Sequence, residues 1–370
     1  MTIARALPLL LLAACVPTQP APGDPDGGPA DTDAAVDARP DAPVDAAIDA
    51  GPRPIDLGVS WTPVGYPVPT AADRAAFYTG HAAYGTQISV HRPWRQDRAS
   101  AGLPDPFVAP IAAESAQYGF ELMYGYGFDV DDAAGGSDLT SVDEPANDTW
   151  TNAATRRDFC AVGVDFARAH HPRYMFLGNE TDAYYRDHHD DWPNWVSELH
   201  ACRDAIHAVS PSTLVFTTFQ LEFTKGAAQK TGRPLVPADW QPIADVAGAV
   251  DGIGFTSYPY FEYETPADLP ATYYREIADH TDLPILFTEL GWVADPSQPY
   301  TGSEAEQAAF VDRFFELTAG LDVRYAVWLA ENDWPPAILG PGSAFHEIGL
   351  RDATGAPRPA DAAWRAHVPR

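Results

Sequence analysis

Phe176–Glu180 reads FLGNE and Ile285–Trp292 reads ILFTELGW, and these two segments are the most informative part of the chain. Each is an apolar run, of the kind that forms a buried strand, and each carries a glutamate where the run ends. A carboxylate placed where a strand leaves the core is costly to remove from water, so it usually has a role. The pattern therefore indicates one site in which Glu180 and Glu289 face each other from two strands.

From residue 55 onward, short apolar runs alternate with longer amphipathic stretches, which indicates a parallel sheet with intervening helices. The expected strands are Ile55–Trp61, Gly85–Val90, Phe120–Tyr124, Tyr174–Leu177, Leu214–Thr218, Gly252–Thr256, Ile285–Thr288 and Arg324–Leu329. The expected helices are Ala71–Ala83, Asp105–Tyr118, Thr151–Ala169, Trp192–Val209, Pro266–Asp279 and Ser303–Ala319, with shorter ones around Asp239–Val246 and Ala360–His367.

Eight such units in residues 55–370 predict an α/β fold, a single-domain (β/α)8 TIM barrel. The main alternative is a doubly wound open sheet, which has a glycine-rich turn after its first strand when it binds dinucleotides. Val59–Pro63, which reads VSWTP, has no such turn. A barrel predicts that active-site residues lie at the carboxyl ends of its strands.

Residues 1–15 predict a lipoprotein signal peptide. Arg5 precedes the apolar run Ala6–Leu12, and LAAC at Leu12–Cys15 resembles a lipobox that directs lipidation of Cys15. An ordinary secretory signal is the alternative, and the apolar run is too short to span a bilayer. Val16 follows the cysteine, which by resemblance to lipoprotein sorting signals indicates the outer membrane or cell surface. Residues 16–54 are rich in Asp, Ala and Pro, which predicts a disordered tether.

The formal net charge of −29 disfavours nucleic acid and anionic polysaccharide as partners, so a neutral substrate is expected. Solubility alone would explain the charge equally well. Cys160 and Cys202 lie in helical segments of a chain expected to be exported, so they form either a disulfide or two unpaired thiols. Their spacing indicates no metal site.

The glutamate pair suits glycoside hydrolysis, which uses two carboxyl groups flanking the scissile bond. Glu180 ends the fourth expected strand and Glu289 ends the seventh. A barrel can place residues from these two strands on opposite sides of its mouth. An ordinary ion pair at each strand end is the alternative.

The chain resembles the retaining glycoside hydrolases built on (β/α)8 barrels that are called clan A. In that clan the fourth strand ends in Asn-Glu and the seventh in a second glutamate, which Asn179-Glu180 and Thr288-Glu289 match. The resemblance implies that Glu180 is the acid/base, that Glu289 is the nucleophile and that no cofactor or metal is needed. The flanking residues are similar to those of the endo-β-1,4-galactanase, β-mannanase and β-1,3-glucanase families.

Other strand-end residues are expected to support this pair. Tyr258 would donate its hydroxyl to Glu289, Asn179 would bind the sugar 2-hydroxyl, and Trp328 would form a flat platform for a sugar face. Arg92 loosely matches an arginine on the second strand of many clan members. The further candidates for substrate binding are His91, Trp61, Trp94, Tyr126, Trp292 and Trp334, although each of these aromatic side chains could instead be ordinary packing.

The sequence therefore predicts a retaining glycoside hydrolase that cleaves a neutral β-linked polysaccharide or oligosaccharide by double displacement. We expect a monomer that is lipid-anchored to a bacterial cell envelope. Two alternatives stay open: a catalytically inactive glycan-binding barrel lipoprotein, and a scaffold protein that uses a barrel.

Overall fold

The structure is a computed structural model that describes residues 54–131, 137–142, 148–231, 237–295, 300–339 and 343–369. The predicted signal peptide and tether lie outside the described residues, apart from Pro54. Within the part that is described, no helix is both long and apolar enough to cross a bilayer.

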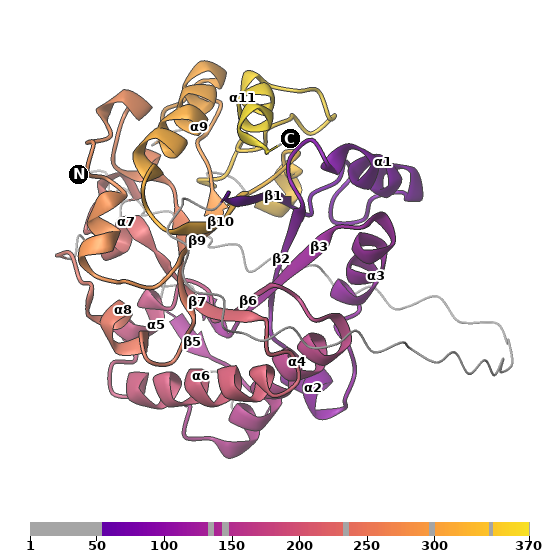
Figure 1. Cartoon of the computed structure of the whole chain (residues 1–370), viewed down its shortest axis with the longest axis vertical. Coiled ribbons are helices and arrows are strands. Elements are labelled where there is room, and N and C mark those ends of the chain that lie inside the picture. The colour runs from indigo at the N-terminus through magenta and orange to yellow at the C-terminus, as the bar shows by residue number, and fades with distance from the viewer. Residues whose placement is uncertain are drawn as a thin grey trace, which may run out of the picture.

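Eight parallel strands close into a barrel in the order β1-β10-β9-β8-β7-β6-β3-β2, which confirms the expected (β/α)8 fold (Figure 1). A short antiparallel pair, β4 and β5, follows β3 and was not expected. Several barrel strands run further than expected, and β2 extends through His91 and Arg92. The bounds of the strands are β1 Asp56–Ser60, β2 Gln87–Pro93, β3 Glu121–Gly127, β4 Asp129–Asp131, β5 Ser137–Leu139, β6 Tyr174–Leu177, β7 Leu214–Gln220, β8 Gly252–Ser257, β9 Ile285–Leu290 and β10 Val323–Trp328.

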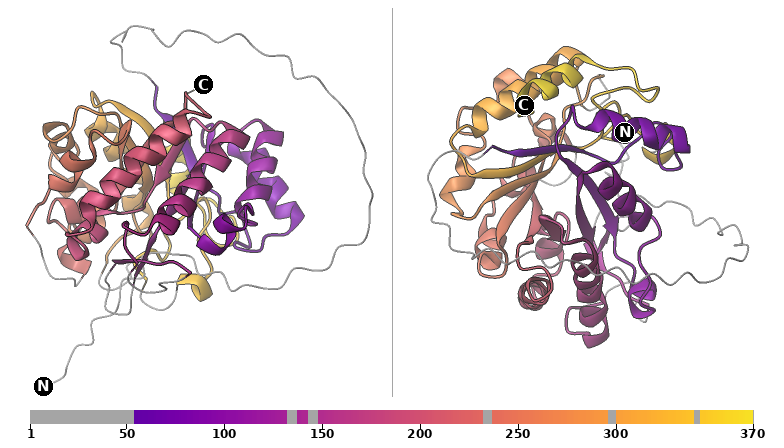
Figure 2. Two further views of the ribbon diagram at one scale, coloured as in Figure 1. Left: turned by 90° about the horizontal axis from the view of Figure 1, so that it is seen from below. Right: turned by 45° about the vertical axis from the view of Figure 1, so that its right-hand side comes forward.

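Helices surround the barrel, and α4 and α6 run side by side along its wall (Figure 2). Side chains cap several of these helices: Asn152 accepts from the backbone N–H of Ala154 at α4, and Ser303 accepts from Glu306 at α9. The bounds of the helices are α1 Ala71–His81, α2 Gln96–Ser100, α3 Val108–Tyr118, α4 Ala153–His170, α5 Asp182–Asp187, α6 Trp192–His207, α7 Leu221–Thr224, α8 Gln241–Val246, α9 Glu304–Thr318, α10 Pro336–Leu339 and α11 Pro359–His367.

The helix expected over Pro266–Asp279 does not form. Two 3₁₀ turns, Pro266–Asp268 and Arg275–Asp279, take its place. Pro270 lies in the middle of this segment, where it lacks the N–H that an α-helix needs and pushes the preceding residue out of the helical region. Leu269 accordingly has extended backbone angles, with φ −62° and ψ 119°.

A compact cluster fills the inside of the barrel, and a larger one joins the barrel wall to the helices. The inner cluster comprises Met123, Tyr174, Phe176, Phe216, Leu286, Tyr325 and Val327. Gly125 makes room for it, because a Cβ at this position would lie only 1.9 Å from the ring of Phe176. The inner cluster also identifies which residues of each strand point into the barrel.

Candidate active site

Glu180 lies just beyond the carboxyl end of β6, in a sharp turn of the chain. Gly178 has φ +79°, and Glu180 itself has φ +49°, a left-handed conformation that is uncommon for a residue with a side chain. The backbone N–H of Glu180 donates to the hydroxyl of Thr218 at 2.8 Å. Only 4 % of Glu180 is exposed, so the turn presents a buried carboxylate at the end of the barrel.

Thr256, on β8, connects the two glutamates. Its hydroxyl donates to Oε1 of Glu180 at 2.6 Å. In the sheet, Thr256 also pairs with Glu289 on the neighbouring strand β9. The structure therefore brings Glu180 and Glu289 to the same end of the barrel, as the sequence predicted, through a threonine that no motif singled out.

A register irregularity in β9 points Glu289 into the barrel mouth. Leu286 lies inside the barrel and Phe287 packs against Phe314 of α9, so strict alternation would send Glu289 outward. The pairing with β8 and with β10 shifts just after Phe287, which is the mark of a β-bulge. As a result Thr288 and Glu289, although consecutive, both line the same pocket.

Two opposing effects set the charge state of Glu289. Burial raises the pKa of this carboxyl to about 7, and the hydrogen bond from Tyr258 lowers it. The Tyr258 hydroxyl donates to Oε2 of Glu289 at 2.5 Å, the contact expected from the sequence. Burial keeps the pKa of Tyr258 well above its usual value, so the phenol stays a donor. The side chain of Glu289 retains 16 % exposure, which leaves it open to the pocket.

His91 is the second neighbour of Glu289. Its Nδ1 lies 3.9 Å from Oε1 of Glu289, and its ring packs against Phe176 with centroids 5.3 Å apart. Burial, reinforced by the charge of Arg92, lowers the pKa of His91 to about 3. His91 is therefore neutral near pH 7 and forms a polar wall of the pocket rather than a charged partner.

Asn179 faces the pocket beside His91. The hydroxyl of Thr218 donates to its Oδ1 at 3.0 Å, which fixes the amide. Gly127 lies under both side chains, and a Cβ there would lie 3.3 Å from Nε2 of His91 and 3.4 Å from Cβ of Asn179. The amide nitrogen of Asn179 makes no hydrogen bond to any residue that the structure describes, so it can donate to a ligand.

The pocket in front of Glu289 is small, with a volume of about 80 Å³. Trp61, expected as a sugar-binding residue, lines it together with His91 and Asn179. Trp334, which follows β10, also lines it. Thr256 and Thr218 had no recognisable signal in the sequence. The other aromatic walls come from strand β6 and from segments outside the barrel strands that the fold brings together. These further walls are Tyr66, Phe107, Phe176 and Phe345.

Trp328 does not form the expected sugar platform. Tyr325 and Val327 point into the barrel, so Trp328, one residue further along β10, points outward. Its indole N–H donates to the carbonyl of Ile348 at 2.8 Å, and its ring packs against Phe310 and Trp364. Trp328 therefore belongs to the contact between the barrel and its helices.

Tyr126 and Trp292 also lie away from the pocket, contrary to the expectation. Tyr126 points outward from β3 and donates its hydroxyl to the carbonyl of Phe159 on α4 at 3.0 Å. Trp292 is fully buried and packs against Tyr260 and Phe310. Both are packing residues, because each falls on the helix-facing side of its strand or of the loop that follows.

Arg92 does not line the pocket but contacts Phe107, one of its walls. Its guanidinium carbon is 4.6 Å from the ring centroid of Phe107, whose ring lines the pocket. Arg92 itself is not among the residues that line the pocket, although His91, the residue before it on β2, is. The structure places Arg92 behind the aromatic wall and does not bring it to Glu289.

Cys160 on α4 and Cys202 on α6 are free thiols in the structure. One ligand atom from each, together with a carboxylate oxygen of Glu198, lie within 4.8 Å of one another. The thiol of Cys202 donates to Oε1 of Glu198 at 3.2 Å, and Arg156 donates to Oε2 of the same carboxylate. The sequence spacing gave no sign of this cluster, and the disulfide stays a prediction.

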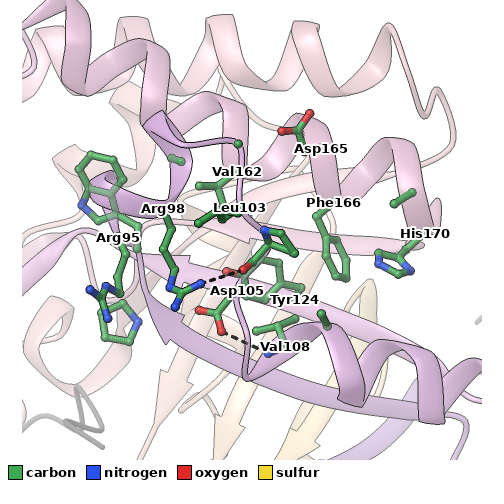
Figure 3. Close-up of a pocket in the computed structure, with 17 residues that line it drawn as sticks. Arg95, Arg98, Leu103, Asp105, Val108, Tyr124, Val162, Asp165, Phe166 and His170 are labelled. Carbon is green, nitrogen blue, oxygen red and sulfur yellow. Dashed lines mark hydrogen bonds between the residues drawn. The ribbon is translucent and has the colours of Figure 1, made fainter. Parts of the chain in front are cut away.

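A larger pocket, of about 320 Å³, lies on the outside of the barrel between α2, α3 and α4 (Figure 3). Its walls include Leu103, Val108 and Phe166, and Arg98 spans part of it to donate to the carbonyl of Pro104 at 3.4 Å. Neither Glu180 nor Glu289 lines this pocket. Size alone therefore does not mark the candidate site, and Glu289 lines the smaller pocket described above.

Comparisons with known proteins show similarity in fold. Neither the protein-family models nor the curated proteins contain a match to the chain. Among solved structures, a GH5_18 protein from Streptomyces cattleya in complex with Manβ1-4GlcNAc matches with a TM-score of 0.63 and 15 % identity, over 85 % of this chain and 80 % of that one. The chain has the (β/α)8 fold of that protein.

Two further solved structures are similar over less of their own length. An exo-β-1,4-mannosidase from Opitutaceae bacterium strain TAV5 has a TM-score of 0.60 and 14 % identity, over 86 % of this chain and 60 % of that one. A family 39 glycoside hydrolase from Bacteroides cellulosilyticus WH2 has a TM-score of 0.56 and 17 % identity, over 85 % of this chain and 64 % of that one. The chain thus spans under two thirds of these two proteins.

Proposed function

We propose that this protein is a retaining glycoside hydrolase that cleaves a neutral β-linked glycan. The observation that carries the proposal is the pair of glutamates held by one strand end: Thr256 donates to Glu180, and Tyr258 donates to Glu289. The small pocket in front of Glu289 has aromatic walls of the kind that pack against sugar faces. The solved structures with the same fold include glycoside hydrolases, which favours this reaction over others.

The proposed reaction proceeds by double displacement. The carboxylate of Glu289 attacks the anomeric carbon while the glycosidic C–O bond breaks and Glu180 gives its proton to the leaving oxygen. Glu180 then takes a proton from water, whose oxygen attacks the anomeric carbon and releases Glu289. The amide nitrogen of Asn179 is positioned to donate to the sugar 2-hydroxyl. This chemistry needs no cofactor.

Rescue by azide tests the two roles separately. We expect Glu180→Gln and Glu289→Gln to lose roughly 10²- to 10⁴-fold in rate. With an activated β-aryl glycoside and azide, Glu180→Ala should yield the β-glycosyl azide, because Glu289 still forms the glycosyl-enzyme. Glu289→Ala should yield the α-glycosyl azide by direct attack. Swapped products would reverse the roles, and full activity in either variant would exclude the paired-carboxylate mechanism.

Substrate identity is best approached with a panel of neutral glycans. The net charge of −29 disfavours anionic polymers, and the solved neighbours are described as a complex with Manβ1-4GlcNAc and as an exo-β-1,4-mannosidase. The panel should therefore contain Manβ1-4GlcNAc, mannan, galactan, xylan and β-1,3-glucan. If the wild type and both glutamine variants bind a glycan equally and none cleaves it, the protein is a glycan-binding barrel.

We also propose that the barrel is anchored to the cell envelope as a monomer, through a lipid on Cys15 and the tether that follows. Cys15→Ala should move the protein from the membrane fraction to the soluble exported fraction. Light scattering of the barrel without its lipid should give the monomer mass. Membrane retention of the variant would contradict the lipid anchor.

A further inference from the structure

Glu222 is a buried carboxylate that the proposed reaction does not use. It lies on α7, immediately after β7, and none of its surface is exposed. Moving a carboxylate out of water is costly unless hydrogen bonds replace the water. Three side chains provide them: Gln220 donates at 2.6 Å, Tyr273 at 2.7 Å and Ser257 at 2.9 Å.

The contacts of Glu222 converge on the end of β8. Ser257 is the last residue of β8 and donates its hydroxyl to Glu222, and Tyr258 is the residue that follows it. The carboxylate therefore holds the side chain of the last residue of β8, next to the point where Tyr258 leaves the sheet. From there the Tyr258 hydroxyl reaches Glu289 at 2.5 Å.

We propose that Glu222 is a positioning residue that aims the Tyr258 hydroxyl at Glu289. This inference rests on the proposed function for its importance, and on the hydrogen bonds alone for its geometry. Displacing a hydroxyl by a fraction of an ångström weakens a hydrogen bond of this length. Loss of Glu222 should thus weaken the contact that keeps Glu289 ionised, without touching either glutamate of the pair.

The surrounding groups allow a pH readout. The titratable groups that face Glu289 are Tyr258 and His91, and Glu180 interacts with the same Tyr258. Burial keeps the pKa of Tyr258 high and that of His91 low, so neither changes charge near pH 7. The groups that face Glu222 are tyrosines whose pKa values burial raises, namely Tyr260, Tyr263, Tyr273 and Tyr274. Glu180 is the other carboxyl of the pair, so the Glu289→Gln variant serves to assign a shift near pH 7 to Glu289.

The experiment compares Glu222→Gln with Tyr258→Phe and with the double variant. Tyr258→Phe removes the donor that lowers the Glu289 pKa, so the acidic limb of kcat/KM should move to higher pH by roughly one unit. Glu222→Gln should move it in the same direction by less. The double variant should move it no further than Tyr258→Phe alone, because Glu222 acts through Tyr258.

A matched control is Glu198→Gln, which changes another buried glutamate, held by Arg156 and far along the chain from β8. It should lower the melting temperature without moving the acidic limb. If Glu222→Gln also lowers only the melting temperature, or adds its shift to that of Tyr258→Phe, the proposal is overturned. Should Glu222→Gln fail to fold, Ser257→Ala and Tyr273→Phe each remove one donor and should give smaller shifts in the same direction.

A second readout does not depend on turnover. In protein labelled with ¹³C at the glutamate carboxyl groups, NMR can follow the titration of Glu289, with Glu289→Gln as the control that assigns its signal. The titration midpoint of Glu289 should lie near pH 7. In Glu222→Gln its midpoint should rise. If the wild type is inactive but the Glu289 midpoint rises in Glu222→Gln, the glycosidase proposal is refuted and the positioning role of Glu222 stands. If the wild type is active but the midpoint does not rise, the glycosidase proposal stands and the positioning role is refuted.

Discussion

At the scale of single residues, Glu289 governs how the site responds to pH. Burial raises its pKa, the hydrogen bond from the Tyr258 hydroxyl opposes the rise, and the resulting pKa is about 7. A nucleophile attacks as the carboxylate, so the reaction needs the deprotonated form. The bulge in β9 produces this situation, because it turns Glu289 from the helix side into a pocket with aromatic and polar walls.

We therefore expect the acidic limb of the kcat/KM profile to lie at an unusually high pH. In the wild type, kcat/KM on a hydrolysed glycan should rise about tenfold per pH unit below pH 7 and level off once Glu289 is ionised. A pH profile from 5 to 9 measures it, with melting curves at each pH to exclude unfolding. A limb centred below pH 5 would contradict the environment described for Glu289.

At the scale of elements, the contact of β10 with α9 and α11 depends on Trp328. The side chain is 1 % exposed and meets Phe310 from one helix and Trp364 from the other. Large aromatic residues in such contacts contribute to stability through buried area and close packing.

Trp328→Ala should accordingly destabilise the protein by roughly 3–5 kcal/mol, since it leaves a cavity between strand and helices. Urea unfolding measures the change. Trp334→Ala, at the pocket wall, should instead raise KM with a smaller effect on unfolding. A Trp328→Phe variant that is stable yet has a strongly raised KM would show that Trp328 binds substrate after all.

Cysteines on two neighbouring helices give a second prediction at this scale. Cys160 and Cys202 lie close enough for their thiols to interact, and α4 packs against α6. Exported protein should contain the disulfide, formed when a disulfide-carrying oxidant accepts the two electrons and two protons that the thiols lose. Intact mass under non-reducing conditions should be about 2 Da lower, and Cys160→Ser should lose up to about 4 kcal/mol of stability. Two alkylated thiols in native exported protein would exclude it.

At the scale of the whole molecule, the chain closes on itself through a buried polar cluster. Tyr84, which follows α1, donates to Asp361 on α11, and Arg365 of α11 binds both. Glu331, in the loop after β10, lies beside them and is 8 % exposed. Burial raises the pKa of Glu331 to about 8, with Arg351 opposing the shift.

This carboxyl makes the stability of the fold pH-dependent. Because the folded state holds the proton up to about pH 8 and the unfolded state releases it near 4.5, stability should fall as pH rises between these values. The slope should be at most about 1.4 kcal/mol per pH unit. Glu331→Gln should reduce the slope in urea unfolding, leaving below pH 7 the part that the raised pKa of Glu289 contributes, while Glu316→Gln on the surface should not change it. Equal slopes in wild type and Glu331→Gln would contradict this assignment.

Much of the fold was predictable because strand position depends on local signals. All eight barrel strands were expected near their observed bounds, and both glutamates were placed at strand ends. The helix expected at Pro266–Asp279 does not form because Pro270 interrupts it, and two 3₁₀ turns take its place. The aromatic candidates failed more often than the polar ones, since Tyr126, Trp292 and Trp328 serve packing as readily as binding.

The amino-acid sequence by itself determined the alternation of apolar runs and helices, and with it the barrel and the strand ends that carry Glu180 and Glu289. Only the tertiary structure decided which way each side chain points. Strands of a parallel barrel are buried on both faces, so their sequences lack the alternation that would reveal the inner side. Barrel closure turned Trp328 outward, the bulge turned Glu289 inward, and the pairing of β8 with β9 placed Thr256 between the two carboxylates.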